Sequence, residues 1–326
     1  MPSASLDVLG ARATMLRRLR HFFAERGVLE VETPLLSASA TTDPALESLQ
    51  THWSGAGSDA CAGLSSGQGL YLHTSPELPM KRLLAAGSGP IYQVCKVFRD
   101  GERGRRHHPE FSLLEWYRPG WSLTTLIDEI TELVRIILQR PDLGCEVLRY
   151  RQLFMDRLGI DPWSADPSML KEAARAGGLT GCDQLELDAD GWLDLLMSQC
   201  LEPDLGRGCM SVVRDYPPSQ AALARLRSSD PAVAERFELY IEGMELANGF
   251  DELTDADEQR ARFRADQRRR QAAGQCVPPI DEAFLAALEA GMPASAGVAL
   301  GLDRLLMCAL GVDRIDAVLA FPVERA

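Results

Sequence analysis

Apolar residues near the start of the chain recur at the spacing of a helix. They fall three or four positions apart within residues 6–26, at Met15, Leu16, Leu19, Phe22 and Phe23. This pattern predicts an amphipathic helix that ends at Gly27. Residues 28–34 then alternate, with Leu29 and Val31 on one face and glutamates on the other. The alternation predicts a strand directly after the helix.

Two longer alternating segments follow. Residues 91–98 and 111–117 both have the pattern of strands, and the polar stretch between them favours a long hairpin. The second strand places four side chains on one face: Phe111, Leu113, Glu115 and Tyr117. Strand character returns in three later segments: 237–246, 297–301 and 317–321.

Helical patterns separate these strands. Residues 122–139 and most of 165–235 have helical spacing interrupted by Pro and Gly. Antiparallel strands separated by helical blocks, without regular βαβ alternation, predict an α+β fold in which helices flank an antiparallel β-sheet. We expect one domain over residues 1–326, with a mainly helical insertion at about 140–235.

Composition and charge narrow the function classes. The 326 residues carry 34 basic and 47 acidic side chains, a net charge of −13, which opposes the binding of a long polyanion. No apolar run reaches the length of a membrane span, and the first residues lack the apolar core of a secretory signal.

The eight cysteines are scattered without a CxxC pair, which predicts free thiols in a cytoplasmic protein. Residues 54–69 are rich in Gly and Ser and predict a loop.

Basic residues gather in the segment between the two hairpin strands. Residues 99–110 contain four Arg and two His in an otherwise acidic chain. Guanidinium groups match phosphate oxygens bidentately, so a nucleoside triphosphate is a natural ligand. The alternative is a solvated loop whose charges are balanced by Asp100, Glu102 and Glu110.

Acidic residues gather further along, in residues 244–253, around an Asn248-Gly249 pair that predicts a turn. Glu245 falls in an apolar strand pattern, where an unpaired carboxylate is costly. We therefore expect a cation beside it, either Mg²⁺ or a substrate ammonium.

A second candidate phosphate site follows in residues 297–304. There a Gly-containing strand leads into a predicted helix over residues 305–310, and Arg304 stands where it can reach a phosphate. A plain tight turn between strand and helix is the alternative.

Four stretches together resemble a known family. They are RGVLEVETP (26–34), VFRDGERGRRHHPEFSLLEWY (97–117), ELANGFDEL (245–253) and GVALGLDR (297–304). They resemble motifs 1, 2 and 3 of the class II aminoacyl-tRNA synthetases, in the lysyl branch, and their order and spacing agree over nearly the whole chain. The resemblance implies a class II catalytic domain that uses ATP to form an aminoacyl-adenylate.

The start of the chain narrows the resemblance. Lysyl-tRNA synthetases place an anticodon-binding domain before motif 1, whereas here motif 1 ends at Pro34, so we expect a catalytic core without that domain. This resembles the stand-alone paralogues that attach (R)-β-lysine to a lysine side chain of translation elongation factor P. Residues 74–84, 216–224 and 236–250 also look closer to those paralogues. The resemblance implies a protein-lysine ligase that forms an amide bond and does not bind tRNA stably.

The resemblance also implies an ATP site. Its residues are Arg99, Asp100, Gly101, His107, His108, Phe111, Glu245, Leu246, Gly301 and Arg304. Arg99 would hold the α-phosphate and the amino-acid carboxylate, and Arg304 would hold the γ-phosphate; these two are the implied catalytic residues. Phe111 would stack on the adenine opposite Arg304. Glu245 and Glu252 would hold Mg²⁺.

An amino-acid site is implied in the same way. Its residues are Ser75, Pro76, Glu77, Glu115, Tyr117, Asn248, Glu252 and Ala299. Glu77, Tyr117 and Glu252 would surround the side-chain ammonium of lysine or (R)-β-lysine. Glu115 and Asn248 would lie nearer the reacting end.

Three positions depart from the family pattern. Gly101 replaces an acidic residue, His108 replaces an amide, and Ala299 replaces a glycine. An added methyl at the floor of the amino-acid pocket changes discrimination by about 1–3 kcal/mol. The Ala299 departure therefore favours a β-amino acid over α-lysine.

Other functions stay open at this point. A truncated lysyl-tRNA synthetase that charges tRNA is one, and the net charge argues against it. A non-catalytic amino-acid-binding paralogue is another, although Arg99, Arg304, Glu245 and Glu252 are all present. Asparagine synthetase shares the fold, but two carboxylates and a phenol favour a cationic substrate. Motif 1 further implies a homodimer.

Overall fold

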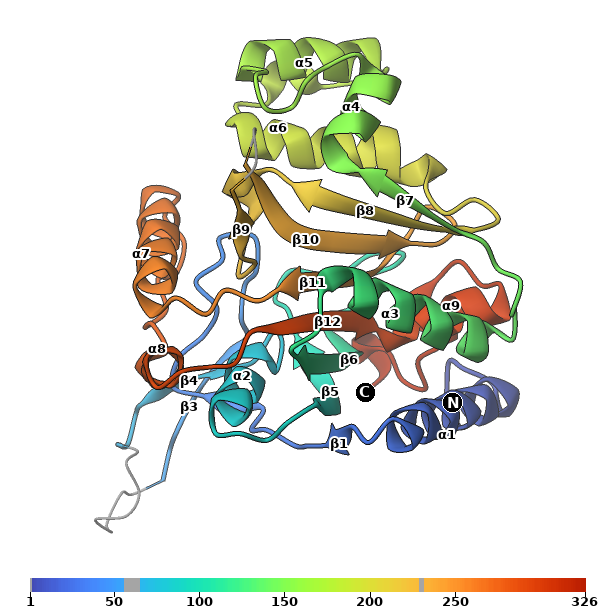
Figure 1. Ribbon diagram of the computed structural model, residues 1–326, viewed down its shortest axis with the longest axis vertical. Coiled ribbons are helices and arrows are strands. Elements are labelled where there is room, and N and C mark those ends of the chain that lie inside the picture. Colours follow the sequence, from blue (N-terminus) through green and yellow to red (C-terminus); the bar gives the residue numbers. More distant parts are fainter. Residues whose placement is uncertain (1, 56–64, 229–231) are drawn as a thin grey trace. The chain divides into compact units, whose positions relative to one another are not determined.

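The computed structural model describes residues 2–55, 65–228 and 232–326 (Figure 1). The chain divides into two compact units. The first unit comprises Met1–Pro119, Thr254–Pro293 and Gly301–Ala326, and the second comprises Gly120–Leu253 and Ala294–Leu300. Most of the predicted Gly/Ser-rich loop, residues 56–64, lies outside the described residues.

The first unit contains the predicted hairpin. The hairpin consists of β5 (Ile91–Phe98) and β6 (Glu110–Pro119), and the short strand β1 (Leu29–Glu30) lies beside β5. β5 and β6 pair antiparallel with Ile91 opposite Tyr117 and Phe98 opposite Glu110, and β1 runs parallel to β5. A separate antiparallel sheet has the order β2 (Leu36–Ser37), β4 (Gly69–Leu72), β3 (Gln50–His52).

The described part of the first unit also contains five α-helices. They are α1 (Leu6–Glu25), α2 (Glu77–Ala85), α7 (Ala256–Ala272), α8 (Glu282–Glu289) and α9 (Leu302–Leu310). α1 begins where the Ser5 hydroxyl accepts the Val8 N–H, and the chain leaves it through Gly27 at φ +63°, a conformation that glycine adopts without strain. Phe23 of α1 stacks on Tyr92 with ring centroids 4.4 Å apart. The apolar face predicted for this helix is therefore buried inside the unit.

The second unit is built on a five-stranded path. The order is β12 (Ser295–Gly301), β11 (Glu245–Asp251), β10 (Val233–Tyr240), β8 (Met210–Tyr216), β7 (Cys145–Arg149), and β9 (Leu226–Arg227) pairs with β10. β7 and β8 are parallel, and the other pairs are antiparallel.

The described residues of this unit also form the α-helices α3 (Leu123–Leu138), α4 (Tyr150–Leu158), α5 (Pro167–Ala176) and α6 (Ala189–Leu196). Figure 1 shows α4, α5 and α6 grouped beside β7 and β8. Their apolar residues, such as Phe154, Leu170 and Trp192, share one core with Val213 of β8. The helical insertion is thus anchored on strands that the helical pattern did not predict.

Several predicted elements are wrong in detail. The predicted strand 237–246 is two strands joined by a turn at Glu242-Gly243, where both residues have positive φ. Asn248-Gly249 is not a turn, because both residues lie inside β11. A glycine is needed there for packing: a Cβ on Gly249 would overlap the ring of Phe237 and lie 3.0 Å from the Gly297 carbonyl oxygen.

The remaining differences concern short or fully buried strands. β8 is buried on both faces, so its sequence lacks the alternation that marks a strand. The predicted strand at 317–321 is not a strand in the structure, and a 3₁₀ turn (Ile315–Ala317) stands at its start. The predicted strand at 28–34 is reduced to β1, whose Leu29 side chain is 55% exposed. Among the described helices, none is long and apolar enough to span a bilayer.

Candidate active site

A buried carboxyl group, that of Glu115, belongs to one of the residues predicted for the amino-acid site and lies in the first unit. Glu115 and Tyr117 share one face of β6, as predicted, and Glu115 is 3% exposed. The Tyr117 hydroxyl donates to Glu115 Oε1 at 2.5 Å, and the Ser75 hydroxyl donates to Oε2 at 2.7 Å. Burial and the charge of Glu77 raise the pKa of Glu115 to about 7, although both hydroxyl hydrogen bonds oppose this. A buried carboxyl with two hydroxyl donors suits a cationic ligand.

The start of α2 brings the other predicted residues to this carboxyl. Ser75 also accepts the backbone N–H of Glu77 at 3.0 Å, and Pro76 is the N-cap of the helix. Glu77 is itself in an ion pair, because Lys81 Nζ lies 2.6 Å from its Oε1. Sequence reasoning did not single out Lys81, although Glu and Lys four residues apart on a helix are a recognisable signal. The Tyr117–Glu115 hydrogen bond brings together two residues to which the resemblance gave different places. Tyr117 was predicted at the substrate ammonium, and Glu115 was predicted nearer the reacting end.

Arg99 has the geometry of an anion-binding residue. Its guanidinium lies over Phe111, 5.0 Å from the ring centroid, and its Nη1 is 3.5 Å from Glu102 Oε1. The Nε of Arg99 is buried and has no hydrogen-bond partner among the described residues. A buried guanidinium donor of this kind fits an anionic oxygen such as that of a phosphate.

Arg304 lies in the first turn of α9, directly after Gly301, which is the N-cap. Its Nη2 is 2.7 Å from His107 Nε2, and its Nε donates to the Arg106 carbonyl oxygen at 3.3 Å. Burial, followed by the charge of Arg304, lowers the pKa of His107, so the imidazole is neutral at pH 7. The structure therefore brings two predicted ATP-site residues, Arg304 and His107, together.

The remaining residues of the basic loop hold its shape. His108 is buried, with Nδ1 2.5 Å from the Glu110 carbonyl oxygen and Nε2 accepting the Val323 N–H at 2.9 Å. Both ring nitrogens are thus engaged by the backbone. Gly101 has φ +76°, and its N–H donates to Asp100 Oδ1 at 2.9 Å. The positive φ explains why glycine replaces an acidic residue here.

The second unit aligns its predicted residues across neighbouring strands. Asn248 of β11 stands opposite Ala299 of β12 on one side and Glu238 of β10 on the other. Cross-strand partners share a face, so these three side chains form a row. Arg236 Nε donates to Asn248 Oδ1 at 3.2 Å, which leaves the amide NH₂ as the group that Asn248 offers to a ligand.

A buried polar network that sequence reasoning missed supports this row. The Arg236 guanidinium lies over Tyr216, 4.5 Å from the ring centroid, and pairs with Glu238. Glu238 also accepts the hydroxyl groups of Tyr216 and Tyr240. Although burial opposes it, the charge of Glu238 holds the pKa of Arg236 above its ordinary value. The sequence does contain a signal for this network: the charged residues Arg236 and Glu238 stand at alternate positions of an otherwise apolar strand pattern and therefore share a face.

The predicted metal ligands lie at the two ends of β11. Tyr240 pairs with Glu245 and Leu239 with Ala247, so Leu246 is the extra residue of a bulge, a feature that re-aims neighbouring side chains. Glu252 is 2% exposed and follows the strand. The described residues contain no cluster of three or more His, Cys, Asp or Glu that could hold a metal. Mg²⁺ usually keeps several waters and is bound by one or two carboxylates plus phosphates. At about 3.3 Å per residue the ends of this strand lie roughly 20 Å apart, so Glu245 and Glu252 can each offer a carboxylate to Mg²⁺ but cannot hold the same ion.

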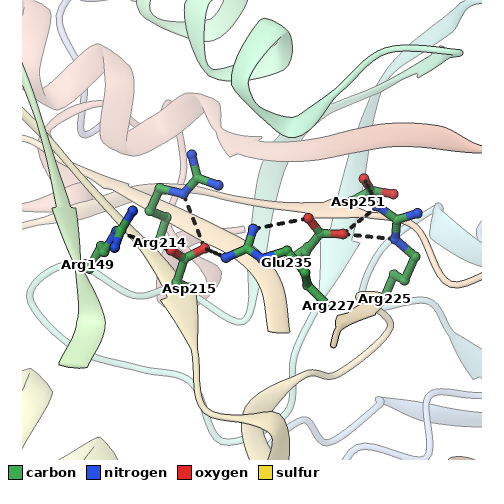
Figure 2. Close-up of polar contacts among 7 residues, drawn as sticks. All are labelled: Arg149, Arg214, Asp215, Arg225, Arg227, Glu235 and Asp251. Atoms are coloured by element: carbon green, nitrogen blue, oxygen red, sulfur yellow. Dashed lines mark hydrogen bonds and ion pairs between the residues drawn. The ribbon is translucent and has the colours of Figure 1, made fainter. Parts of the chain in front are cut away.

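An ion-pair network borders the end of β11 (Figure 2). Its members are Arg149, Arg214, Asp215, Arg225, Arg227, Glu235 and Asp251. Arg225 Nη2 lies 2.9 Å from Asp251 Oδ2, and the Arg225 N–H donates to the Asp251 carbonyl oxygen at 2.7 Å. The network thus holds the residue that precedes Glu252. Sequence reasoning missed it because its members come from five separate strands, β7 to β11, and from Arg225 just before β9.

Comparison with known proteins agrees with this fold. The family model described as tRNA synthetases class II (D, K and N) matches residues 3–325. The chain therefore belongs to this class II synthetase family, which confirms the predicted fold class and implies the use of ATP.

Relatives narrow the comparison further. The elongation factor P–(R)-β-lysine ligase of Edwardsiella ictaluri (strain 93-146) is 50% identical over 325 residues, covering 100% of this chain and 98% of the relative. The protein of the same name from Proteus mirabilis (strain HI4320) is also 50% identical over 325 residues, with the same coverage. That of Vibrio cholerae serotype O1 is 49% identical over 326 residues, again covering 100% and 98%.

Proposed function

We propose that this protein activates (R)-β-lysine, or lysine, with ATP and transfers it to the ε-amine of a lysine on translation elongation factor P. A carboxylate oxygen of the amino acid attacks the α-phosphate, which releases pyrophosphate and forms the adenylate. The acceptor amine then attacks the carbonyl carbon, AMP leaves, the amine loses a proton and an amide bond remains. No enzyme nucleophile is needed, so the protein acts by positioning and by neutralising charge.

The buried Glu115 is the structural observation that carries this proposal. The carboxyl group of Glu115 is shielded from water and hydrogen-bonded by the hydroxyls of Tyr117 and Ser75. Together these groups present a negative charge and two hydroxyl dipoles to a cationic ligand. A lysine-like side chain satisfies this group, whereas a neutral side chain would leave it uncompensated. The full-length similarity to relatives named as elongation factor P–(R)-β-lysine ligases supports the same substrate and acceptor.

ATP is assigned to the basic residues of the first unit. Arg99 would hold the α-phosphate through its buried Nε, and Arg304 would hold the γ-phosphate from the start of α9. Glu245 and Glu252, at opposite ends of β11, are each a candidate carboxylate for Mg²⁺, an ion that would neutralise phosphate charge when bound. His107 would line the site as a neutral imidazole.

Intact-mass measurement tests the proposal. Purified elongation factor P is incubated with enzyme, ATP, Mg²⁺ and either lysine isomer. We expect one lysyl addition, which is lost when ATP is omitted or when Glu115→Gln replaces the wild type. An unchanged acceptor mass together with charging of tRNA would instead support a tRNA synthetase. Binding of lysine without pyrophosphate release would support a non-catalytic binding protein.

A further inference from the structure

Lys81 is a fully buried ammonium group that the proposed roles do not use. It lies on α2, one turn after Glu77, and its side chain is 0% exposed. Its Nζ is 2.6 Å from Glu77 Oε1 and 5.9 Å from the ring centroid of Phe284 on α8. Lysine is almost never fully buried unless it is paired. The Glu77 partner, whose side chain is 18% exposed, therefore has its charge compensated from inside the protein.

This ion pair is linked to the buried carboxyl group by one serine. The Ser75 hydroxyl accepts the Glu77 N–H and donates to Glu115 Oε2. The geometry therefore sets two carboxyl groups and one ammonium around the start of α2. After burial, the charge of Glu77 raises the pKa of Glu115, while the charge of Lys81 lowers it.

Cys95 of β5, Tyr117 of β6 and Asp303 of α9 are titratable groups on the elements that contain Glu115 or pack against its strand. On β5, burial and then Glu115 raise the pKa of Cys95 to about 12, so that thiol is neutral. On β6, Tyr117 donates its hydroxyl to the carboxyl group. α9 also packs on β6, and the carboxylate of its Asp303 pairs with Arg12 and accepts the backbone N–H of Ser112.

We propose, resting on the function proposed above, that Lys81 is a positioning residue of the amino-acid site. Its ammonium neutralises Glu77 and holds that carboxylate in place, so that Glu115 supplies the charge that the substrate ammonium meets. Without Lys81, two uncompensated carboxylates would share one buried site, and one of them would take up a proton near neutral pH. Binding of a cationic substrate would then require release of that proton.

A set of four proteins tests the proposal: wild type, Lys81→Met, Glu77→Gln and the double variant. Calorimetry measures the Kd of each lysine isomer and of ATP between pH 5.5 and 9. Wild-type affinity for the amino acid should rise with pH through about 7, as Glu115 ionises. The midpoint is the pH at which the amino-acid affinity reaches half of its high-pH value. It should move to higher pH in Lys81→Met, to lower pH in Glu77→Gln, and close to the wild-type pH in the double variant.

The size of the effect depends on pH. If the midpoint moves up by about one unit, Lys81→Met binds the amino acid about fivefold more weakly than wild type at pH 7 and within about twofold at pH 9. The Kd of ATP should stay within about twofold throughout. Lys81→Arg keeps the charge and should keep the wild-type midpoint.

A merely structural ion pair gives a different result. Affinity would then fall equally at every pH with no movement of the midpoint, which would overturn the proposal. If Lys81→Met does not fold, Glu77→Gln and the double variant still fix the order of midpoints, because a buried pair replaced by neutral groups is often tolerated.

A ligand-free measurement separates this proposal from the function on which it rests. Infrared titration of the Glu115 carboxyl group, assigned with Glu115→Gln, should give the same order of midpoints in the free proteins. If wild type binds neither lysine isomer but the order holds, the proposed function fails and the role of Lys81 in setting the charge of Glu115 stands. A different order overturns that role.

Discussion

At Glu115, burial and hydrogen bonding act on one carboxyl group in opposite directions. Burial favours the protonated form, and the charge of Glu77 adds to it, whereas the hydroxyls of Tyr117 and Ser75 favour the ionised form. The balance leaves the pKa at about 7 instead of 4.5. A site prepared for a cation is therefore partly protonated at neutral pH until the cation arrives.

This balance predicts a pH-dependent effect of Glu115→Gln on stability. The folded pKa, about 7, lies above the unfolded value, 4.5. The contribution of Glu115 to stability is therefore fully present below pH 4.5 and is lost as the pH rises through 7. We expect the variant to gain about 1–3 kcal/mol over wild type at pH 8 and to gain nothing at pH 4. Urea unfolding at both pH values measures this, with exposed Glu186→Gln as the control. An equal effect at both pH values would contradict the assigned pKa.

Arg304 gives the second test at this scale. Arg304→Ala should remove a charged phosphate contact and reduce ATP–pyrophosphate exchange by about tenfold to a hundredfold or more. Arg264→Ala, an exposed arginine on α7, should leave exchange unchanged. Exchange by Arg304→Ala within about tenfold of wild type would refute the role of this residue.

At the scale of the element, β11 combines a close packing contact with residues of the predicted amino-acid site. The strand brings Asn248 beside Ala299, and its next residue must approach Phe237 closely. The glycine at 249 thus serves the packing of β10 against β11, and the Asn-Gly pair has no part in a turn.

Gly249→Ala should therefore destabilise the protein by about 1–3 kcal/mol or more, because the added Cβ overlaps the Phe237 ring. Gly10→Ala is the matched control: it lies in α1 with no atom within 4 Å of the added Cβ, and it should stabilise by about 0.5–1 kcal/mol. Thermal unfolding of both variants gives the comparison. A loss of stability at Gly10 equal to that at Gly249 would show that the packing argument is wrong.

The elements also show which features were predictable from sequence. The helix at 6–25 and the hairpin of β5 and β6 were predicted almost to the residue, because their apolar periodicity is strong and local. β8 was missed because burial on both faces removes the alternation. The turn predicted at Asn248-Gly249 was wrong, because an Asn-Gly pair is typical of turns in sequence. In the folded protein the glycine is instead required by the close approach of the Phe237 ring.

The site was predictable to a different degree. The resemblance supplied the residues that we expect to contact substrate, and the structure places Glu115 with Tyr117 and Arg304 with His107. The supporting residues, such as Lys81 and Arg236, act through other side chains. Their partners lie on neighbouring strands or one helical turn away, so a list of motifs does not reveal them.

At the scale of the whole molecule, the net charge is −13, and the positive charge of the basic loop at residues 99–110 is partly compensated by acidic residues elsewhere in the chain. Arg103 pairs with Asp316 and Glu324, and Arg105 pairs with Asp313, so half of the four arginines are compensated by the C-terminal segment. The acids that pair with these two arginines are not the ones named in the solvated-loop alternative, of which Glu102 lies 3.5 Å from Arg99 instead. Arg99, with its buried Nε, is the loop arginine that best retains the character of a phosphate ligand.

The last prediction concerns assembly. Motif 1 implies a homodimer. In this segment Phe22 and Phe23 are buried within the chain, whereas Leu29 of β1 is 55% exposed and can contact a second copy. We expect light scattering to give about twice the monomer mass of 35.8 kDa at micromolar concentration. Leu29→Arg should shift the protein towards the monomer, because it places a charge where apolar contact is expected. Leu185→Arg, on a residue 39% exposed in the second unit, is the control and should leave the mass unchanged. A wild-type mass near 36 kDa would contradict the dimer, and a dimer that Leu29→Arg leaves intact would place its interface elsewhere.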